Sequence, residues 1–134
     1  MVHTFDYRQN VPLAVGDIVR VLQSSGIRRP TSDPARIERM FANADVVLSA
    51  WHGDRVVGLA RAITDHCYCC YLSDLAVERE YQRLGIGREL IARTRAAIGE
   101  QVSLMLLAAP EAETYYPPLG FSPIDNGFVI ARKR

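Results

Sequence analysis

The chain lacks long apolar runs, a strong excess of charge of either sign, and an even set of cysteines. No apolar run approaches the ~20 residues of a membrane span, and residues 1–6 lack the basic start and apolar stretch of a signal peptide. The 16 Lys and Arg residues face 15 Asp and Glu residues, for a formal net charge of +1. That balance argues against a nucleic-acid binder with a broad basic surface. We therefore expect no membrane and no nucleic-acid partner.

The three cysteines, Cys67, Cys69 and Cys70, are odd in number and crowded into one predicted strand. This arrangement does not suit a disulfide framework, so the reducing cytoplasm is the expected compartment. Neighbouring strand residues point to opposite faces, so His66 and these thiols cannot converge on one metal ion. We expect no metal site and interpret the cysteines as small buried apolar residues.

What the chain does have is 134 residues and 49% hydrophobic content, which suit one domain over residues 1–134. Periodicity and turn residues predict a helix at 13–25, a second helix capped by Asp33, strands at 46–51, 55–63 and 67–77, a helix at 86–98, a strand at 102–108, a short helix at 110–116 and a strand at 128–131. The fold class is mixed α/β, in which an antiparallel hairpin enters a parallel strand pair with a right-handed crossover.

Residues 68–88 carry the most information. An apolar strand ends in Leu75-Ala76-Val77, a short charged loop follows, and Gln82-Arg83-Leu84-Gly85-Ile86-Gly87-Arg88 leads into an amphipathic helix. A glycine-rich turn at a helix start offers free backbone N–H groups and the positive end of the helix dipole. Such a site favours an anion, and phosphate above all.

Three interpretations of this turn compete. A dinucleotide site is disfavoured because Leu90 replaces the third glycine and eight residues separate Val77 from Gly85. A Walker loop is excluded because no Gly-Lys-Ser/Thr follows. In the second interpretation, the glycines serve only to turn the chain tightly.

The third interpretation uses the whole segment, which resembles the acetyl-coenzyme A motif of the GNAT superfamily of N-acetyltransferases. Downstream, residues 115–121, Tyr-Tyr-Pro-Pro-Leu-Gly-Phe, are similar to the Phe-Tyr-x-x-Leu-Gly-Phe segment of that family. The order of the elements also fits. The resemblance implies a GNAT-type mixed sheet, with antiparallel hairpins and a splayed parallel strand pair, flanked by helices.

The resemblance implies acetyl-coenzyme A as cosubstrate and assigns residues to it. Its pantetheine arm would lie in the gap between strands 67–77 and 102–108, along the main chain of Leu75, Ala76 and Val77. The pyrophosphate would lie on the N–H groups that follow Gln82, namely those of Arg83, Leu84, Gly85, Ile86, Gly87 and Arg88. The chain departs from the family at Arg83, where many members carry Gly, and at Ala109, where many carry Asn.

The transfer step needs a neutral amine, a donor to the carbonyl oxygen and a proton for the leaving thiolate. Tyr116 matches the tyrosine that protonates the sulfur in the family, and Tyr115 is expected to pack beside Phe121. No Glu or His occupies positions 71 or 73, where members commonly carry a base. The base is therefore Asp74, turned inward by a bulge, or a water relayed through Tyr71 or Ser73. Asp74 could equally be a structural group that bonds nearby backbone.

Strict alternation puts odd-numbered residues 71–77 on one face of the strand and even-numbered residues on the other. The acceptor is a small-molecule or peptide amine, and Arg28 and Arg29 in the loop between the first two helices could recognise a carboxylate or phosphate on it. A homodimer is compatible with the sequence. The alternative function is a non-catalytic acyl-coenzyme A sensor, because no carboxylate base is evident.

Overall fold

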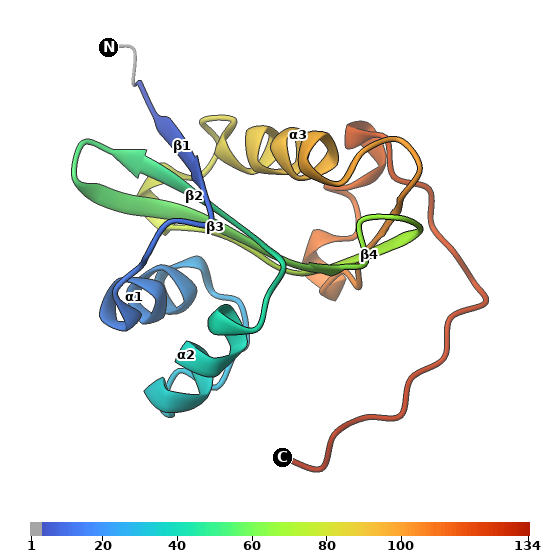
Figure 1. The fold of residues 1–134 in the computed structure, drawn as a ribbon, viewed down its shortest axis with the longest axis horizontal. Helices are drawn as coiled ribbons and strands as arrows, with labels where there is room; N and C mark the ends of the chain where they lie inside the picture. Colours follow the sequence, from blue (N-terminus) through green and yellow to red (C-terminus); the bar gives the residue numbers. More distant parts are fainter. Residues whose placement is uncertain (1–3) are drawn as a thin grey trace.

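The computed structural model describes residues 4–134 and is organised around one five-stranded sheet (Figure 1). The strands lie in sequence order: β1 (Asp6–Gln9), β2 (Val46–His52), β3 (Arg55–Thr64), β4 (Cys69–Val77) and β5 (Ser103–Met105). The first four strands pair antiparallel, and β5 is parallel to β4. The mixed sheet predicted from the sequence is confirmed.

Helices cover both faces of this sheet (Figure 1). The helices α1 (Val15–Ser25) and α2 (Pro34–Ala42) lie on one face, and α3 (Ile86–Ile98) lies on the other. As expected, the Asp33 side chain caps α2 by accepting a hydrogen bond from the Arg36 N–H. Gly26 ends α1 in the left-handed conformation that glycine adopts without strain. Two apolar cores result, one on each face of the sheet.

The helix α3 lies close against the sheet because β3 carries a glycine beneath it. A Cβ atom at Gly58 would lie 2.9 Å from Ile86 Cγ2 and 3.3 Å from Leu90 Cδ1. Ile86 and Leu90 are buried, as their helical spacing predicts. On the outer side, Glu89 and Arg93 form the expected ion pair at 2.8 Å. The first turn of α3, and the glycine turn before it, are thus placed by contact with β3.

A β-bulge interrupts β4. Arg61 lies opposite Asp74, while the next residue, Ala62, lies opposite Leu72, which leaves Ser73 as an extra residue on β4. The expectation of strict alternation is therefore wrong. Leu72 packs into the core on the α3 side, whereas Asp74 is buried on the side of α1 and α2, where it meets arginines. Because of this one extra residue, the side chains after Ser73 point to the face opposite to the one that strict alternation predicts.

The strands β4 and β5 separate after a short ladder. Their pairing runs only from Cys69↔Ser103 to Tyr71↔Met105. The strand predicted at 102–108 ends at Met105, while β4 continues to Val77 without a β5 partner. The expected splayed pair is present, with β5 shorter than predicted.

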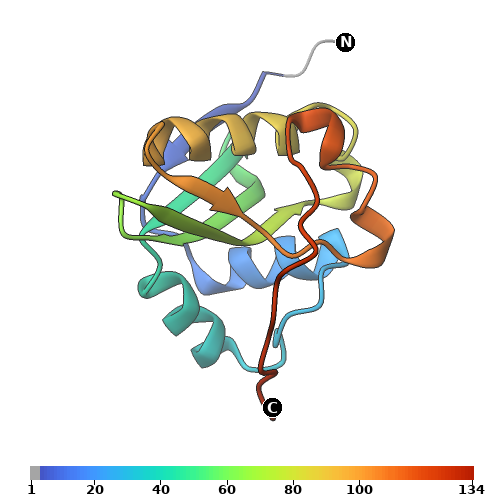
Figure 2. The same cartoon turned by 90° about the vertical axis from the view of Figure 1, so that its right-hand side faces the viewer.

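The C-terminal strand predicted at 128–131 is wrong. Phe128 is 99% exposed and Ile130 is 100% exposed. A strand needs an edge to pair with, and β5, at three residues, offers little. Instead the segment runs past the ends of β4 and β5 towards the α1–α2 loop (Figure 2). At its end, Arg36 Nη2 donates a hydrogen bond of 3.2 Å to the main-chain oxygen of Arg134.

Two smaller predictions also need correction. The short helix predicted at 110–116 is a 3-10 turn, η2 (Pro110–Ala112), and Pro117 opens a second one, η3 (Pro117–Leu119), rather than ending a helix. Of the three cysteines only Cys70 is buried, because the strand begins at Cys69 and the residues before it form an exposed turn. Among residues 4–134, no helix combines the length and apolar character that crossing a membrane requires.

Candidate functional site

A cavity of about 1460 Å³ lies along the gap between β4 and the chain beyond β5, and it extends from the α1–α2 loop to the start of α3. Most of the residues predicted to form the site line it: Arg28, Arg29, Tyr71, Ser73, Leu75, Val77, Gln82, Arg83, Gly85, Ile86, Gly87, Arg88 and Tyr116. The sequence therefore predicted one continuous site from two motifs that lie about 30 residues apart.

Three predicted residues do not line this cavity. Ala76 is 1% exposed and belongs to the core on the α1 and α2 side. Leu84 is 45% exposed on the outside of the turn. Asp74 is fully buried. The side chains of Ala76 and Leu84 therefore take no part in lining the gap.

The glycine turn leaves the N-terminus of α3 open. Gly85 occupies the cap position at φ 86°, and within residues 4–134 no side chain caps it. Glu89 N–H donates to the Gly85 carbonyl oxygen at 3.1 Å, so helical bonding begins at the fourth residue of the helix. The amides of Ile86, Gly87 and Arg88 precede it and have no intrahelical acceptor. These amides and the helix dipole favour a bound anion.

Arg83 adopts a left-handed conformation, with φ 67°. A side chain in this region costs about 1 kcal/mol relative to glycine, which explains why glycine is common at this position in the family that the motif resembles. Arg83 thus occupies a backbone conformation that glycine would adopt with less strain. The arginine adds a positive charge beside the open amides.

The second residue of α3, Gly87, faces Tyr115. A Cβ atom at Gly87 would overlap Tyr115 Oη and would lie 4.0 Å from Leu75 Cδ2. Burial raises the pKa of the Tyr115 phenol, and the charge of Arg88 opposes this in part. Residues from β4, α3 and the segment after η2 therefore converge at this point.

Tyr116 packs where Tyr115 was expected to. Its ring meets Phe121 edge-on, with 5.5 Å between the ring centroids, and it lies against the core on the α3 side. The prediction that Tyr115 fills this packing position is wrong, because Tyr115 is 42% exposed. Burial raises the pKa of the Tyr116 phenol as well, so the phenols of Tyr115 and Tyr116 remain protonated at neutral pH.

Asp74 is held between two guanidinium groups. Its Oδ1 accepts from Arg29 Nε and its Oδ2 accepts from Arg61 Nε, each at 2.5 Å. Arg29 also donates to the Ser73 carbonyl oxygen at 2.6 Å, and Arg61 donates to Ser73 Oγ at 2.9 Å. The carboxylate that the bulge turned away from the cavity therefore fixes both the bulge and the α1–α2 loop.

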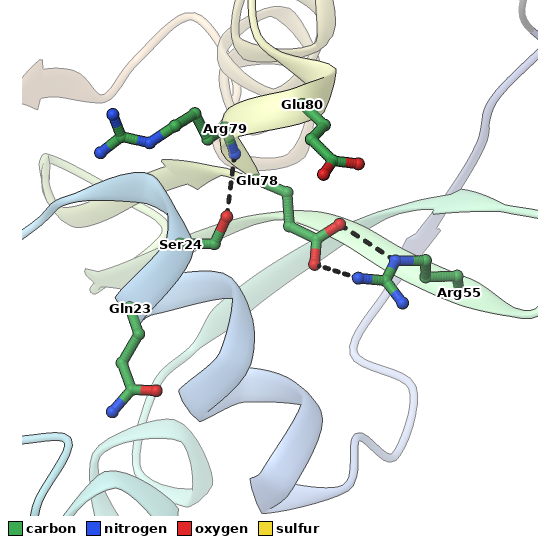
Figure 3. Close-up of a pocket in the computed structure, with 6 residues that line it drawn as sticks. All are labelled: Gln23, Ser24, Arg55, Glu78, Arg79 and Glu80. Carbon is green, nitrogen blue, oxygen red and sulfur yellow. Dashed lines mark hydrogen bonds and ion pairs between the residues drawn. The ribbon is translucent and has the colours of Figure 1, made fainter.

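A second buried carboxylate anchors the other end of β4 (Figure 3). Glu78 accepts hydrogen bonds from Arg20 and from Arg55, at 2.8 to 3.1 Å. Next to it, the Arg79 N–H donates to Ser24 Oγ at 3.0 Å. These groups border a separate polar cavity of about 310 Å³. They attach the chain just before the glycine turn to α1.

Five residues of the site were not identified from the sequence: Arg36, Arg61, Glu78, Tyr115 as a neighbour of the turn, and Arg132. A signal existed for two of them. Arg61 is a lone charge inside an otherwise apolar strand, and Glu78 follows Asp74 at an even spacing. Arg36 and Arg132 come to the cavity only through the path of the α1–α2 loop and of the C-terminal segment. No local pattern encodes those paths.

The geometry suits a ligand with a phosphate group at one end and a long arm. Open amides lie at the glycine turn, and beyond Tyr71 the β4 main chain borders the cavity, where no strand of the described part of the chain lies beside it on that side. An arm in the gap can hydrogen-bond this main chain, while Leu75 and Val77 supply apolar contacts. Coenzyme A has these two parts, so the residues fit it.

Comparison with known proteins identifies the family of this chain. The model for the acetyltransferase (GNAT) domain matches residues 21–131. An uncharacterized N-acetyltransferase of Prochlorococcus marinus is 26% identical over 127 residues, which cover 90% of this chain and 69% of that protein.

Solved structures share the fold. A probable acetyltransferase of meticillin-resistant Staphylococcus aureus has a TM-score of 0.81 at 23% identity, covering 96% of this chain and 100% of that one. An aminoglycoside N-acetyltransferase in complex with CoA has a TM-score of 0.72 at 19% identity, covering 98% of this chain and 96% of that one.

Proposed function

The chain belongs to the GNAT acetyltransferase family, and from this premise we propose that it is an N-acyltransferase using acetyl-coenzyme A. The acetyl group passes directly to a primary amine of a small molecule or peptide in a ternary complex. The observation that carries the proposal is the single cavity that joins the open amides of α3 to the splayed strands. The aminoglycoside N-acetyltransferase with the same fold supports a small-molecule amine as the acceptor.

The residues that hold the coenzyme follow from the open groups of the site. The amides of Ile86, Gly87 and Arg88 receive the pyrophosphate, and Arg83 and Arg88 add charge. The main chain of β4 from Leu75 to Val77 receives the pantetheine arm. Bound in this way, the coenzyme supplies a thioester whose acyl carbon accepts the amine nitrogen and releases the thiol.

We assign the two tyrosines different roles. Tyr116 is the proton donor to the departing sulfur, since it lines the cavity, its ring is fixed against Phe121, and burial keeps the phenol protonated. Tyr115, whose hydroxyl lies against Gly87, borders the phosphate end of the coenzyme. A phenol at that place affects coenzyme affinity more than proton transfer.

Asp74 is a positioning residue in this proposal rather than the base. Both of its oxygens accept hydrogen bonds from arginines, and it has no surface in the cavity. Ser73 and Tyr71 do line the cavity, so they orient the water that takes the proton from the amine. The amine nitrogen forms the C–N bond, the C–S bond breaks, and the amine proton leaves to solvent.

A sensor function remains the second candidate, and one observation favours it. Of the described residues that line the cavity, Glu111 is the sole carboxylate and none is a histidine. A module that binds acyl-coenzyme A without turnover would need neither. Such a protein would bind the coenzyme tightly, and Tyr116→Phe would change nothing.

The deciding experiment is thiol release from acetyl-coenzyme A with a panel of primary amines. Wild-type protein should release thiol in proportion to the acetylated amine detected by mass spectrometry. Calorimetry on the same samples measures coenzyme binding. Binding without thiol release from any amine would replace the enzyme proposal with the sensor.

A further inference from the structure

We infer that the acceptor is a primary amine that also carries an anionic group, a carboxylate or a phosphate. This inference rests on the proposed function, because it names the class of molecule that the acceptor end of the same cavity takes. Its basis is the distribution of charge: the residues around that cavity are strongly positive, although the chain as a whole is almost neutral.

The cavity collects the positive charge of the protein. Among residues 4–134, seven arginines line it, against one carboxylate, that of Glu111. Counting the buried Asp74 as well leaves an excess of five positive charges. The whole chain has a formal net charge of +1, so the rest of the molecule is net negative. A charge so concentrated in a cleft raises the local concentration of anions and repels cations.

The arginines that line the cavity belong to two groups. Arg83 and Arg88 flank the glycine turn and serve the coenzyme phosphates. Arg29 and Arg61 lie at Ser73, four residues and about 13 Å of strand away from Val77. Arg29 and Arg61 share Asp74 there, so this pair retains one positive charge after neutralisation.

Three further arginines complete the acceptor end: Arg28 in the α1–α2 loop, Arg36 on α2 and Arg132 in the C-terminal segment. Within residues 4–134 none of them forms an ion pair with a carboxylate. Arg36 holds the C-terminal segment through Arg134, which keeps Arg132 beside the cavity. Three separate elements therefore contribute guanidinium groups to the lining of one cavity, and such groups recognise planar or tetrahedral oxyanions.

The same charges help the chemistry. Positive charge near an ammonium group lowers its pKa and favours the neutral amine that attacks the thioester. This effect compensates for the lack of a histidine or a second carboxylate in the cavity. A polycation such as an aminoglycoside would meet repulsion instead, so the acceptor of this chain differs in charge from that of its aminoglycoside-acetylating structural relative.

The test is a series of amines matched in length: 4-aminobutyrate, its uncharged amide, and 1,4-diaminobutane. With 2-aminoethyl phosphate added, the series also separates carboxylate from phosphate recognition, and sisomicin represents the polycations. We expect kcat/KM for thiol release to fall at least tenfold from the acid to the amide and further to the diamine. Raising the salt from 0.05 to 0.5 M should reduce this preference.

The matched variants are Arg36→Gln and Arg39→Gln, on the same helix but with only Arg36 at the cavity. Arg36→Gln should raise KM for the anionic acceptor at least fivefold and leave KM for acetyl-coenzyme A unchanged, whereas Arg39→Gln should alter neither. Equal kcat/KM across the series, or a preference for the diamine, overturns the inference while leaving the acyltransferase proposal in place.

If no amine releases thiol, the acyltransferase proposal fails instead. Calorimetry with coenzyme A and 4-aminobutyrate or 2-aminoethyl phosphate then decides the inference: binding weakened by Arg36→Gln supports it, and no binding of either anion overturns it.

Discussion

Arg29 and Asp74 are 45 residues apart in the sequence and lie 2.5 Å apart, Nε to Oδ1, in the structure. This ion pair attaches the α1–α2 loop to β4 at the bulge. Arg61 completes the arrangement from β3. Three elements are thus joined at one fully buried carboxylate, which sets one wall of the cavity.

We predict that Asp74→Asn destabilises the fold by about 3 kcal/mol, because it leaves two guanidinium groups without their counter-charge in a buried place. Chemical denaturation measures the change, with Asp125→Asn, at an exposed position, as the control expected to stay within about 0.5 kcal/mol. A loss below about 1 kcal/mol for Asp74→Asn would mean that solvent replaces the carboxylate.

Tyr116→Phe should lower kcat about 10²-fold with little change in KM for acetyl-coenzyme A, since it removes the proton donor and keeps the ring. Tyr115→Phe should raise that KM several-fold and leave kcat nearly unchanged. Steady-state kinetics of both variants tests the pair. The reverse pattern would exchange the two roles.

Gly87→Glu should abolish coenzyme binding while the fold is kept, because the side chain would enter the space beside Tyr115 and its charge would repel the pyrophosphate. Gly16→Glu is the matched control: Gly16 is likewise the second residue of its helix, and a Cβ atom there meets nothing within 4 Å. Calorimetry gives the affinity and circular dichroism the fold. Retained affinity in Gly87→Glu would contradict the phosphate site.

Gly58→Ala should destabilise the protein by about 1–3 kcal/mol, because the added methyl group has Ile86 Cγ2 at 2.9 Å and both Ala50 Cβ and Leu90 Cδ1 at 3.3 Å. Since Ile86 opens α3, we also expect weaker coenzyme binding. Gly16→Ala, on an open face of α1, should be neutral or stabilise by up to about 1 kcal/mol. Equal stabilities of the two variants would show that α3 can shift without cost.

Acid should release the turn between β3 and β4. Asp65 accepts hydrogen bonds from the N–H groups of Cys67, Tyr68 and Cys69, which lower its pKa below the usual value near 3.8. A lowered folded-state pKa adds stability that is complete above the unfolded-state pKa and lost as pH falls towards the folded-state value. The stability difference between wild type and Asp65→Asn should therefore be constant from pH 7 to about 5 and shrink below about 4. Denaturation series across this range measure it, and a difference independent of pH would contradict the assignment.

The sequence predicted those parts of the site that are local. The glycine turn, the inward face of α3 and the hairpin of β2 and β3 depend on periodicity and turn residues, which neighbours in sequence supply. A bulge beside Asp74 is compatible with the sequence, but the direction in which it turns the carboxylate could not be predicted, because that depends on Arg61 and Arg29, two long-range partners of Asp74. The missing strand at 128–131 fails for a similar reason. Its residues suit a strand, but pairing needs an edge that β5 is too short to offer.

Because β4 parts from β5 at Tyr71, the gap in which we propose that the coenzyme binds is also where the sheet is least held together. A ligand that is hydrogen-bonded along this edge of β4 stabilises the strand as a neighbouring strand would. Resistance to heat and to proteases then follows the supply of coenzyme, with a gain of about 2.7 kcal/mol when the free coenzyme is at a hundred times its dissociation constant. Without bound coenzyme, the protein would unfold and be degraded more readily than with it.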